Sequence, residues 1–118
     1  MSEKFSSVVG IIGAGIMGEA LLAALKKAGL NANSIAIADK RIERVAELQS
    51  NYDCAAKSPS EIAKSSRNIL LVVKPQDMDS LLSEIGKEIG SDQRVISFAA
   101  GKKTALIESY VSQGTAVL

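Results

Sequence analysis

The chain has 118 residues, of which 47% are hydrophobic and 23% are charged, with 14 basic side chains against 13 acidic ones. A chain of this length can build the core of one domain, and its aliphatic content excludes a disordered tail. The balanced charge argues against a nucleic-acid partner, and the absence of histidine removes the most common general base and metal ligand.

The composition also limits where we expect the protein to work. Cys54 is the one cysteine, so no intrachain disulfide can form, and a reducing cytoplasm is the expected location. The longest apolar runs, such as residues 69–73, are far shorter than the roughly 20 residues of a membrane-spanning helix. Residues 1–7 are polar and lack the apolar core of a signal peptide. We therefore expect no membrane segment and no metal site.

The first predicted elements are a strand, a glycine turn and a helix. Residues 8–12 (VVGII) form a short apolar run of the kind found in buried parallel strands. Helical spacing begins at Ile16, and Gly29 is the expected C-cap, with Leu30 as its hydrophobic contact. One broad apolar face of this helix is predicted to contain Ile16, Met17, Ala20, Leu21, Ala24, Leu25 and Ala28.

Strands and helices alternate along the rest of the chain. Apolar runs predict strands at residues 34–38, 54–56, 69–73 and 94–99, and a further strand from residue 115. Helical spacing predicts helices at residues 42–49, 77–89 and 104–111. Ser58, Pro59 and Glu61 open another helix as its N-cap, first and third residues. This order predicts a single α/β domain over residues 1–118, with a Rossmann-like, doubly wound, mostly parallel sheet and helices on both faces.

The sequence GAGIMG is a complete G-x-G-x-x-G motif between the first strand and the first helix. Gly13 permits the tight turn, Gly15 lets a pyrophosphate approach the backbone, and Gly18 lets the helix pack closely on the strand. The N–H groups that open the helix would point at the anion. The motif therefore predicts a pyrophosphate site at Gly13, Ala14, Gly15, Ile16, Met17 and Gly18.

A glycine-rich turn can also exist for packing alone, so its context decides between the two interpretations. This turn follows a strand and opens a helix, and Asp39 ends the next strand close to the expected distance of roughly 20 residues. The combination favours a dinucleotide site.

The triplet Asp39-Lys40-Arg41 bears on the choice of cofactor. A carboxylate at the tip of the second strand accepts hydrogen bonds from the ribose hydroxyls and repels a 2′-phosphate, which favours NAD. Lys40 and Arg41 can instead hold that phosphate, which favours NADP. The alternative is a solvated charge cluster with Asp39 as a helix N-cap, a role compatible with ribose binding. Both cofactors stay open, and Arg41 favours NADP.

Two further strand ends carry candidate residues. Lys74 and Pro75 follow the most apolar strand, at the sheet edge where ligands bind in such folds; the alternative is a solvated strand end. Ala99 and Ala100 follow the next strand, where small side chains could let a nicotinamide lie against the backbone; the alternative is an ordinary tight turn. Cys54 is expected to be a buried apolar side chain, because no histidine can activate it.

Four segments together resemble the N-terminal domain of the pyrroline-5-carboxylate reductases. They are GIIGAGIMGEAL at residues 10–21, IADKR at 37–41, LLVVKPQ at 70–76 and VISFAAG at 95–101. The glycine turn is shared with the 3-hydroxyisobutyrate dehydrogenases. A strand that ends in Val-Lys-Pro and is followed at this distance by Ile-Ser-x-Ala-Ala-Gly is much more specific, and the likeness covers essentially the whole chain.

The resemblance implies hydride transfer from NAD(P)H to the imine carbon of pyrroline-5-carboxylate, giving proline. It implies a pyrophosphate cradle at residues 13–18 and adenosine-ribose and phosphate contacts at residues 39–41. The resemblance also implies that the wall beside the cofactor is formed by Val73, Lys74 and Pro75. It places Ala99 and Ala100 near the nicotinamide. No catalytic side chain is implied, because the chemistry falls mostly to the cofactor.

The chain departs from the family at three places. Ile16 stands where the family often has a polar amide, and Ser58-Pro59 where it often has an asparagine for the adenosine ribose. The family continues after the last strand into a Met-Pro-Asn-Thr-Pro-like segment and a helical domain, which builds the dimer and most of the substrate pocket. We therefore expect an incomplete enzyme, inactive alone and homo-oligomeric through the absent domain. The alternatives are a stand-alone nucleotide-binding module or part of a 3-hydroxyisobutyrate or prephenate-type dehydrogenase.

Overall fold

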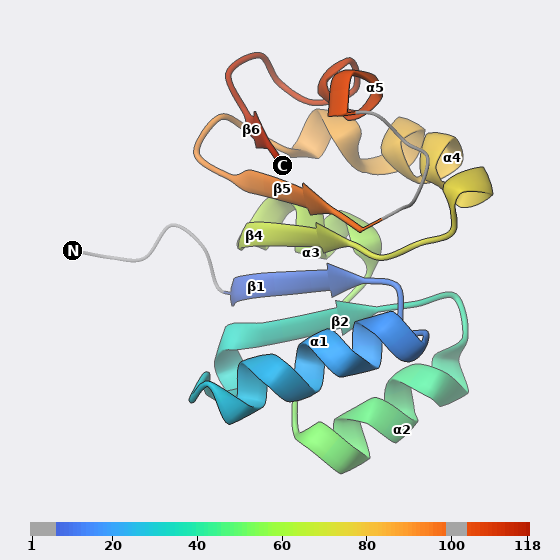
Figure 1. Cartoon of the computed structure of the whole chain (residues 1–118), viewed down its shortest axis with the longest axis vertical. Helices are drawn as coiled ribbons and strands as arrows, with labels where there is room; N and C mark the ends of the chain where they lie inside the picture. Colours follow the sequence, from blue (N-terminus) through green and yellow to red (C-terminus); the bar gives the residue numbers. More distant parts are fainter. Residues whose placement is uncertain (1–6, 99–103) are drawn as a thin grey trace.

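Six parallel strands in the order β3-β2-β1-β4-β5-β6 form one sheet in the computed structural model, which describes residues 7–98 and 104–118. The chain runs outward from β1 in both directions, so the doubly wound Rossmann-like fold predicted from the sequence is confirmed (Figure 1). The strands are β1 (Ser7–Ile12), β2 (Ile35–Ala38), β3 (Ala55–Ala56), β4 (Ser66–Leu71), β5 (Arg94–Ser97) and β6 (Ala116–Val117).

Helices cover both faces of this sheet. They are α1 (Ile16–Lys27), α2 (Ile42–Tyr52), α3 (Pro59–Ser65), α4 (Pro75–Ile85) and α5 (Thr104–Glu108), with 3₁₀ turns η1 (Ala32–Ser34) and η2 (Gly86–Glu88). In Figure 1, α1 lies in front of the sheet and α3 behind it. Side chains of α1 and α2 join one apolar cluster, and those of α3, α4 and α5 join the other.

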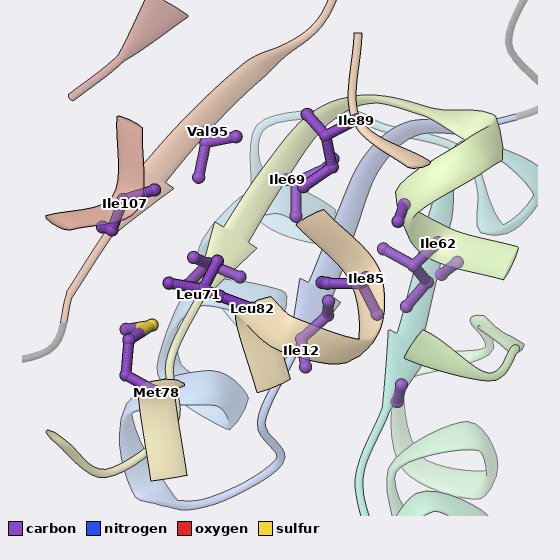
Figure 2. Packing of buried hydrophobic residues seen from close by; sticks show 13 residues of the cluster. Ile12, Ile62, Ile69, Leu71, Met78, Leu82, Ile85, Ile89, Val95 and Ile107 are labelled. Atoms are coloured by element: carbon purple, nitrogen blue, oxygen red, sulfur yellow. The ribbon is translucent and has the colours of Figure 1, made fainter. Parts of the chain in front are cut away.

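Alternation along the strands divides the core between the two faces. Ile11 of β1 packs with α1 and α2, whereas its neighbour Ile12 packs with the opposite cluster. Figure 2 shows that larger cluster, in which Met78 and Leu82 of α4 lie near Leu71 of β4. Apolar residues point to both faces because both are covered by helices, which is why these strands are continuous apolar runs in the sequence.

The orientation of α1 differs from the expected one. Its buried side is formed by Gly18 and Leu22, while Ile16 is 91% exposed and Ala20 lies on the solvent side. The cause is the close approach of the helix to the strand, because a Cβ on Gly18 would overlap the carbonyl oxygen of Gly13. That contact fixes the rotation of α1 and turns the predicted alanine stripe towards solvent.

The central strand β4 begins and ends earlier than predicted. It starts at the polar residue Ser66 and ends at Leu71, so Val72 and Val73 lie beyond it. The polar start pairs with β1, and the Asn68 side-chain amide donates to the carbonyl of Val8 at 2.9 Å. Pairing with β1 therefore extends the strand into residues that the apolar pattern does not mark.

Helix boundaries also shift where proline is involved. Pro75 is the first residue of α4, so this helix begins two residues before the predicted Asp77. The missing N–H of proline costs nothing at the first helical position. The same helix ends at Ile85 and tightens into η2, rather than continuing to Ile89.

Two predicted helix ends have the expected geometry. Leu30 donates its N–H to the carbonyl of Leu25 at 3.2 Å, and Gly29 donates to Lys26 at 3.1 Å, which closes α1 in a Schellman motif. At the start of α3, Ser58 and Glu61 exchange hydrogen bonds of 3.0 and 3.1 Å and form a capping box.

Two of the expected absences can be examined over residues 7–98 and 104–118. Within these ranges, no helix combines the length and apolarity needed to cross a membrane. Nor do they contain a cluster of three side chains suited to hold a metal ion. Cys54 is buried, and burial raises the pKa of its thiol.

The packing of α1 can be tested by adding a methyl group at two glycines of the same turn. We expect Gly18→Ala to lower the free energy of unfolding by about 1–3 kcal/mol, because the new methyl overlaps a backbone oxygen. Gly15→Ala is the matched control: its Cβ would have nothing within 4 Å, and the expected loss is below about 1 kcal/mol. Urea unfolding measures both, and equal effects would contradict the close-approach argument.

Candidate dinucleotide-binding site

The candidate site lies where β1 and β4 end side by side. The chain leaves β1 towards β2 on one side and leaves β4 towards β5 on the other, so the connections diverge and open a crevice at this edge. The glycine turn follows β1, Asp39 follows β2, and Val73 follows β4 by two residues. The fold thus brings three of the four predicted segments to one edge.

The glycine turn has the geometry of an anion cradle. Gly13 has a φ of +117°, and a Cβ there would lie 2.5 Å from the carbonyl oxygen of Val72. Gly15 is the N-cap of α1 and has open space where its Cβ would be. No side chain of the described residues caps this helix. Its first N–H groups, at Ile16 and Met17, therefore lack intrahelical partners and suit a phosphate.

The Asp39 carboxylate ties the end of β2 to the glycine turn. Its Oδ2 accepts from the Ala14 N–H at 2.7 Å, and its Oδ1 accepts from the Arg41 N–H at 2.8 Å. The Arg41 guanidinium adds bonds of 2.9 and 3.1 Å to the two oxygens. These bonds, those of Arg41 first, lower the pKa of Asp39 to about 2.

Asp39 is not the N-cap of the following helix. Arg41 occupies that position in α2, so the N-cap alternative considered from the sequence is wrong. Asp39 instead accepts the N–H of a residue two positions ahead, the local bond that aspartate forms readily in turns. The Asp39 carboxylate therefore lies at the glycine turn, bonded to Ala14, rather than over the start of α2.

The two basic neighbours of Asp39 point to different partners. Lys40 is 87% exposed, and its Nζ lies 4.0 Å from Asp77 at the start of α4. Arg41 forms an ion pair with Asp39, yet 55% of the Arg41 side chain is exposed. Arg41 is therefore a cation that lies beside the Asp39 carboxylate and is also accessible to solvent.

An open groove of about 310 Å³ adjoins Asp39, between α2 and the start of α3. Ile42, which is 80% exposed, contributes an apolar wall, and Ser58 a polar edge. An apolar wall with a few polar groups suits a flat base and its sugar. This groove was not predicted from the sequence, in which the available signal is the isoleucine directly after the charged triplet. Its lining residues are Asp39, Ile42, Val45, Ala46, Gln49, Ala56, Lys57, Ser58 and Glu61.

The segment after β4 passes directly behind the glycine turn. The Val72 N–H donates to the carbonyl of Ile12 at 2.8 Å, which holds this segment against β1. Val73 packs against the larger core cluster, Lys74 is exposed, and Pro75 opens α4. Ala99 and Ala100, expected near the nicotinamide, lie outside the described residues.

The sequence matches a known oxidoreductase family. Residues 8–101 match the family described as NADP oxidoreductase coenzyme F420-dependent. The pyrroline-5-carboxylate reductase of Methanosarcina acetivorans is 35% identical over 112 residues, which cover 93% of this chain and 42% of that protein. The pyrroline-5-carboxylate reductase of Escherichia coli is 36% identical over 95 residues, which cover 79% of this chain and 35% of that protein. The chain thus spans less than half of either relative.

Solved structures share the fold. A pyrroline-5-carboxylate reductase from Coxiella burnetii superposes with a TM-score of 0.82 at 22% identity, over 95% of this chain and 42% of that one. The NADP-bound pyrroline carboxylate reductase of Plasmodium falciparum gives 0.78 at 22% identity, over 96% of this chain and 41% of that one. Prephenate dehydrogenase of Aquifex aeolicus superposes with a TM-score of 0.77 at 16% identity, over 94% of this chain and 41% of that one. The resemblance to pyrroline-5-carboxylate reductases inferred from the sequence is confirmed by the sequence relatives.

The grip of Arg41 on Asp39 can be tested through the Asp39 titration. We expect Arg41→Ala to raise the pKa of Asp39 from about 2 towards its ordinary 3.8, because the first cause of the shift is removed. Carbon-detected NMR of the carboxyl group measures this. Lys40→Ala is the control, since Lys40 makes its ion pair with Asp77 instead.

The lowered pKa of Asp39 determines how the free energy of unfolding changes with pH. In the wild type, the Asp39 carboxylate stabilises the folded state above pH 3.8, and this contribution is lost as the pH falls towards 2. Arg41→Ala should therefore flatten acid destabilisation in that window. An unchanged Asp39 pKa in the variant would contradict the assigned cause.

Proposed function

This chain belongs to the NADP oxidoreductase coenzyme F420-dependent family, and we propose that its 118 residues form the NADP(H)-binding domain of a pyrroline-5-carboxylate reductase. The observation that carries the proposal is the open start of α1 above Gly15, with the Asp39–Arg41 pair beside it. The 35% identity to a pyrroline-5-carboxylate reductase over 93% of this chain supports the reaction class.

The cofactor pyrophosphate would bind at the glycine turn. Its oxygens would accept from the N–H groups of Ile16 and Met17, helped by the positive end of the α1 dipole. The side chain of Ile16 offers no hydrogen bond, so the backbone donors carry this contact alone. Gly15 leaves room for the phosphate to reach them.

The adenosine half would lie on the α2 side of the turn. A ribose hydroxyl would replace one of the Arg41 guanidinium bonds to Asp39, and Ile42 would support the adenine in the groove. Arg41 would contact the 2′-phosphate that distinguishes NADP from NAD. Because Arg41 also neutralises Asp39, the carboxylate repels that phosphate less than an unpaired one would.

The nicotinamide half would extend towards Val73, Lys74 and Pro75, with Ala99 and Ala100 in the same neighbourhood. When bound, NADPH would supply the hydride that the imine carbon of pyrroline-5-carboxylate accepts, giving proline. The residues of this chain would hold the reactive ring in place rather than exchange protons with the substrate. This division of work agrees with a chain that contains no histidine.

The imine pocket and the subunit contacts would belong to a further domain. The two pyrroline-5-carboxylate reductases are more than twice as long as the part matched here, which is 42% and 35% of their lengths. We assign the substrate pocket and the contacts of a homo-oligomer to that remaining part. The present residues would then be a cofactor domain without turnover of their own.

Cofactor binding is the direct test. Isothermal titration of the chain should show NADPH binding more tightly than NADH. Arg41→Ala should weaken NADPH by about tenfold or more and leave NADH nearly unchanged, because only NADPH offers a second charged group to pair with. Arg67→Ala removes an equal charge from the opposite end of β4 and serves as the control.

Each other outcome changes a different part of the proposal. A chain that binds neither nucleotide would refute the cofactor domain, and tighter binding of NADH would reverse the cofactor assignment. Reduction of pyrroline-5-carboxylate by the 118 residues alone would refute the separate substrate domain. Oxidation of a hydroxy acid by the longer protein, without imine reduction, would favour the dehydrogenase alternative.

A further inference from the structure

We propose that Arg44 is a positioning residue that orders the glycine turn from the side of α2, so that the N–H groups of the turn face the cofactor pyrophosphate. Arg44 lies on α2, one helical turn after the N-cap Arg41. Its side chain is only 20% exposed and reaches the turn between β1 and α1. The inference rests on the proposed function, because the ligand it serves is the proposed cofactor.

The guanidinium of Arg44 holds two consecutive carbonyl groups of the turn. Its Nε donates to the carbonyl of Ala14 at 2.6 Å, and its Nη2 lies 3.4 Å from the carbonyl of Gly15. The Gly15 carbonyl also accepts the N–H of Glu19 at 2.9 Å, the first turn of α1. One side chain of α2 is thus bonded to the backbone on both sides of Gly15.

Two residues hold Arg44 in this position. Glu19 of α1 accepts from Arg44 Nη2 at 2.7 Å, and its other oxygen accepts from the Tyr52 hydroxyl at 2.7 Å. Glu47 accepts from Nη1 on the outer side. The bonds from Tyr52 and Arg44 lower the pKa of Glu19, so this partner stays ionised. The arginine is therefore held from α1 and α2 together.

The carbonyls that Arg44 holds determine where the neighbouring N–H groups point. A trans peptide unit is planar, with its C=O and N–H in opposite directions. The carbonyl of Ala14 shares its unit with the N–H of Gly15, and the carbonyl of Gly15 shares one with the N–H of Ile16. Fixing both carbonyls towards α2 turns both N–H groups away from it, towards the open side above Gly15.

Arg44 differs from Arg41 in how many of its guanidinium N–H groups remain available to a ligand. A guanidinium has five N–H groups, and the described contacts of Arg44 use four of them. It cannot offer a phosphate the paired donors of a free arginine. Arg41 is the more exposed of the two, at 55% of its side chain. The geometry thus assigns ligand contact to Arg41 and backbone order to Arg44.

The test compares three nucleotides on two arginine variants. ADP has the pyrophosphate without a 2′-phosphate. Adenosine 2′-monophosphate has the 2′-phosphate without a pyrophosphate, and NADPH has both. We expect Arg44→Gln to weaken ADP and NADPH by a similar factor, about tenfold, and to spare adenosine 2′-monophosphate. Arg41→Ala should weaken adenosine 2′-monophosphate and NADPH and spare ADP. Glu43→Gln, an exposed change on the same helix, is the control.

A second readout needs no ligand. The N–H groups of Ala14 and Glu19 are hydrogen-bonded, to Asp39 and to the Gly15 carbonyl, and report on the order of the turn. Their amide hydrogen exchange in the free protein should accelerate in Arg44→Gln and remain unchanged in Glu43→Gln. Tyr52→Phe should give a smaller acceleration, because Tyr52 acts through Glu19. If Arg44→Gln does not fold, Arg44→Lys keeps the charge but lacks the planar fork that spans two carbonyls, and it replaces the glutamine variant in both measurements.

The outcomes separate this inference from the proposed function. A selective loss of adenosine 2′-monophosphate would make Arg44 a phosphate ligand and overturn the positioning role. Equal weakening of all three nucleotides would indicate a general structural defect and also overturn it. Unchanged exchange at the Ala14 and Glu19 amides overturns it whichever nucleotides bind. A wild type that binds no nucleotide while exchange still depends on Arg44 would refute the proposed function and leave the ordering of the turn supported.

Discussion

The close approach of α1 to β1 sets the geometry of this molecule. At Gly18 the helix backbone comes so near the carbonyl of Gly13 that no side chain fits between them. This contact fixes the rotation of α1, which buries Leu22 and leaves Ile16 in solvent. It also places the start of the helix over the end of β1, where its first N–H groups have no intrahelical partner and suit a negatively charged ligand. The anion cradle and the packing of the helix are two results of one constraint.

Two carboxylates stand near a site suited to anions, and each is paired with an arginine. Asp39 is gripped by Arg41, and Glu19 by Arg44. Without these pairs, two negative charges beside the glycine turn would oppose a pyrophosphate. With them, the carboxylates act as anchors for the turn, through the Ala14 N–H and through the guanidinium on the Ala14 carbonyl. Acidic groups thus take part in organising the backbone of the candidate anion site.

Local features of the fold could be predicted from the sequence, and features that depend on distant partners could not. The Schellman end at Gly29 and the alternation of strands follow from neighbouring residues. The solvent-facing stripe of α1 was misjudged, because alanine fits a buried and an exposed helix face equally well. The polar start of β4 is stabilised by β1, 60 residues away at the bond between Asn68 and Val8. Arg44 resembles any solvated helix arginine until α2 is placed beside the turn.

The hydrogen bond between Tyr52 and Glu19 also gives the protein an optical signal of its own. The chain has no tryptophan and only two tyrosines, so no indole signal masks the absorption and emission of Tyr52 and Tyr110. The Tyr52 hydroxyl donates to a carboxylate that is bonded in turn to Arg44, the side chain that reaches the glycine turn. Its spectrum therefore depends on the state of that carboxylate. Tyrosine spectroscopy is therefore a label-free way to follow the contacts among Tyr52, Glu19 and Arg44.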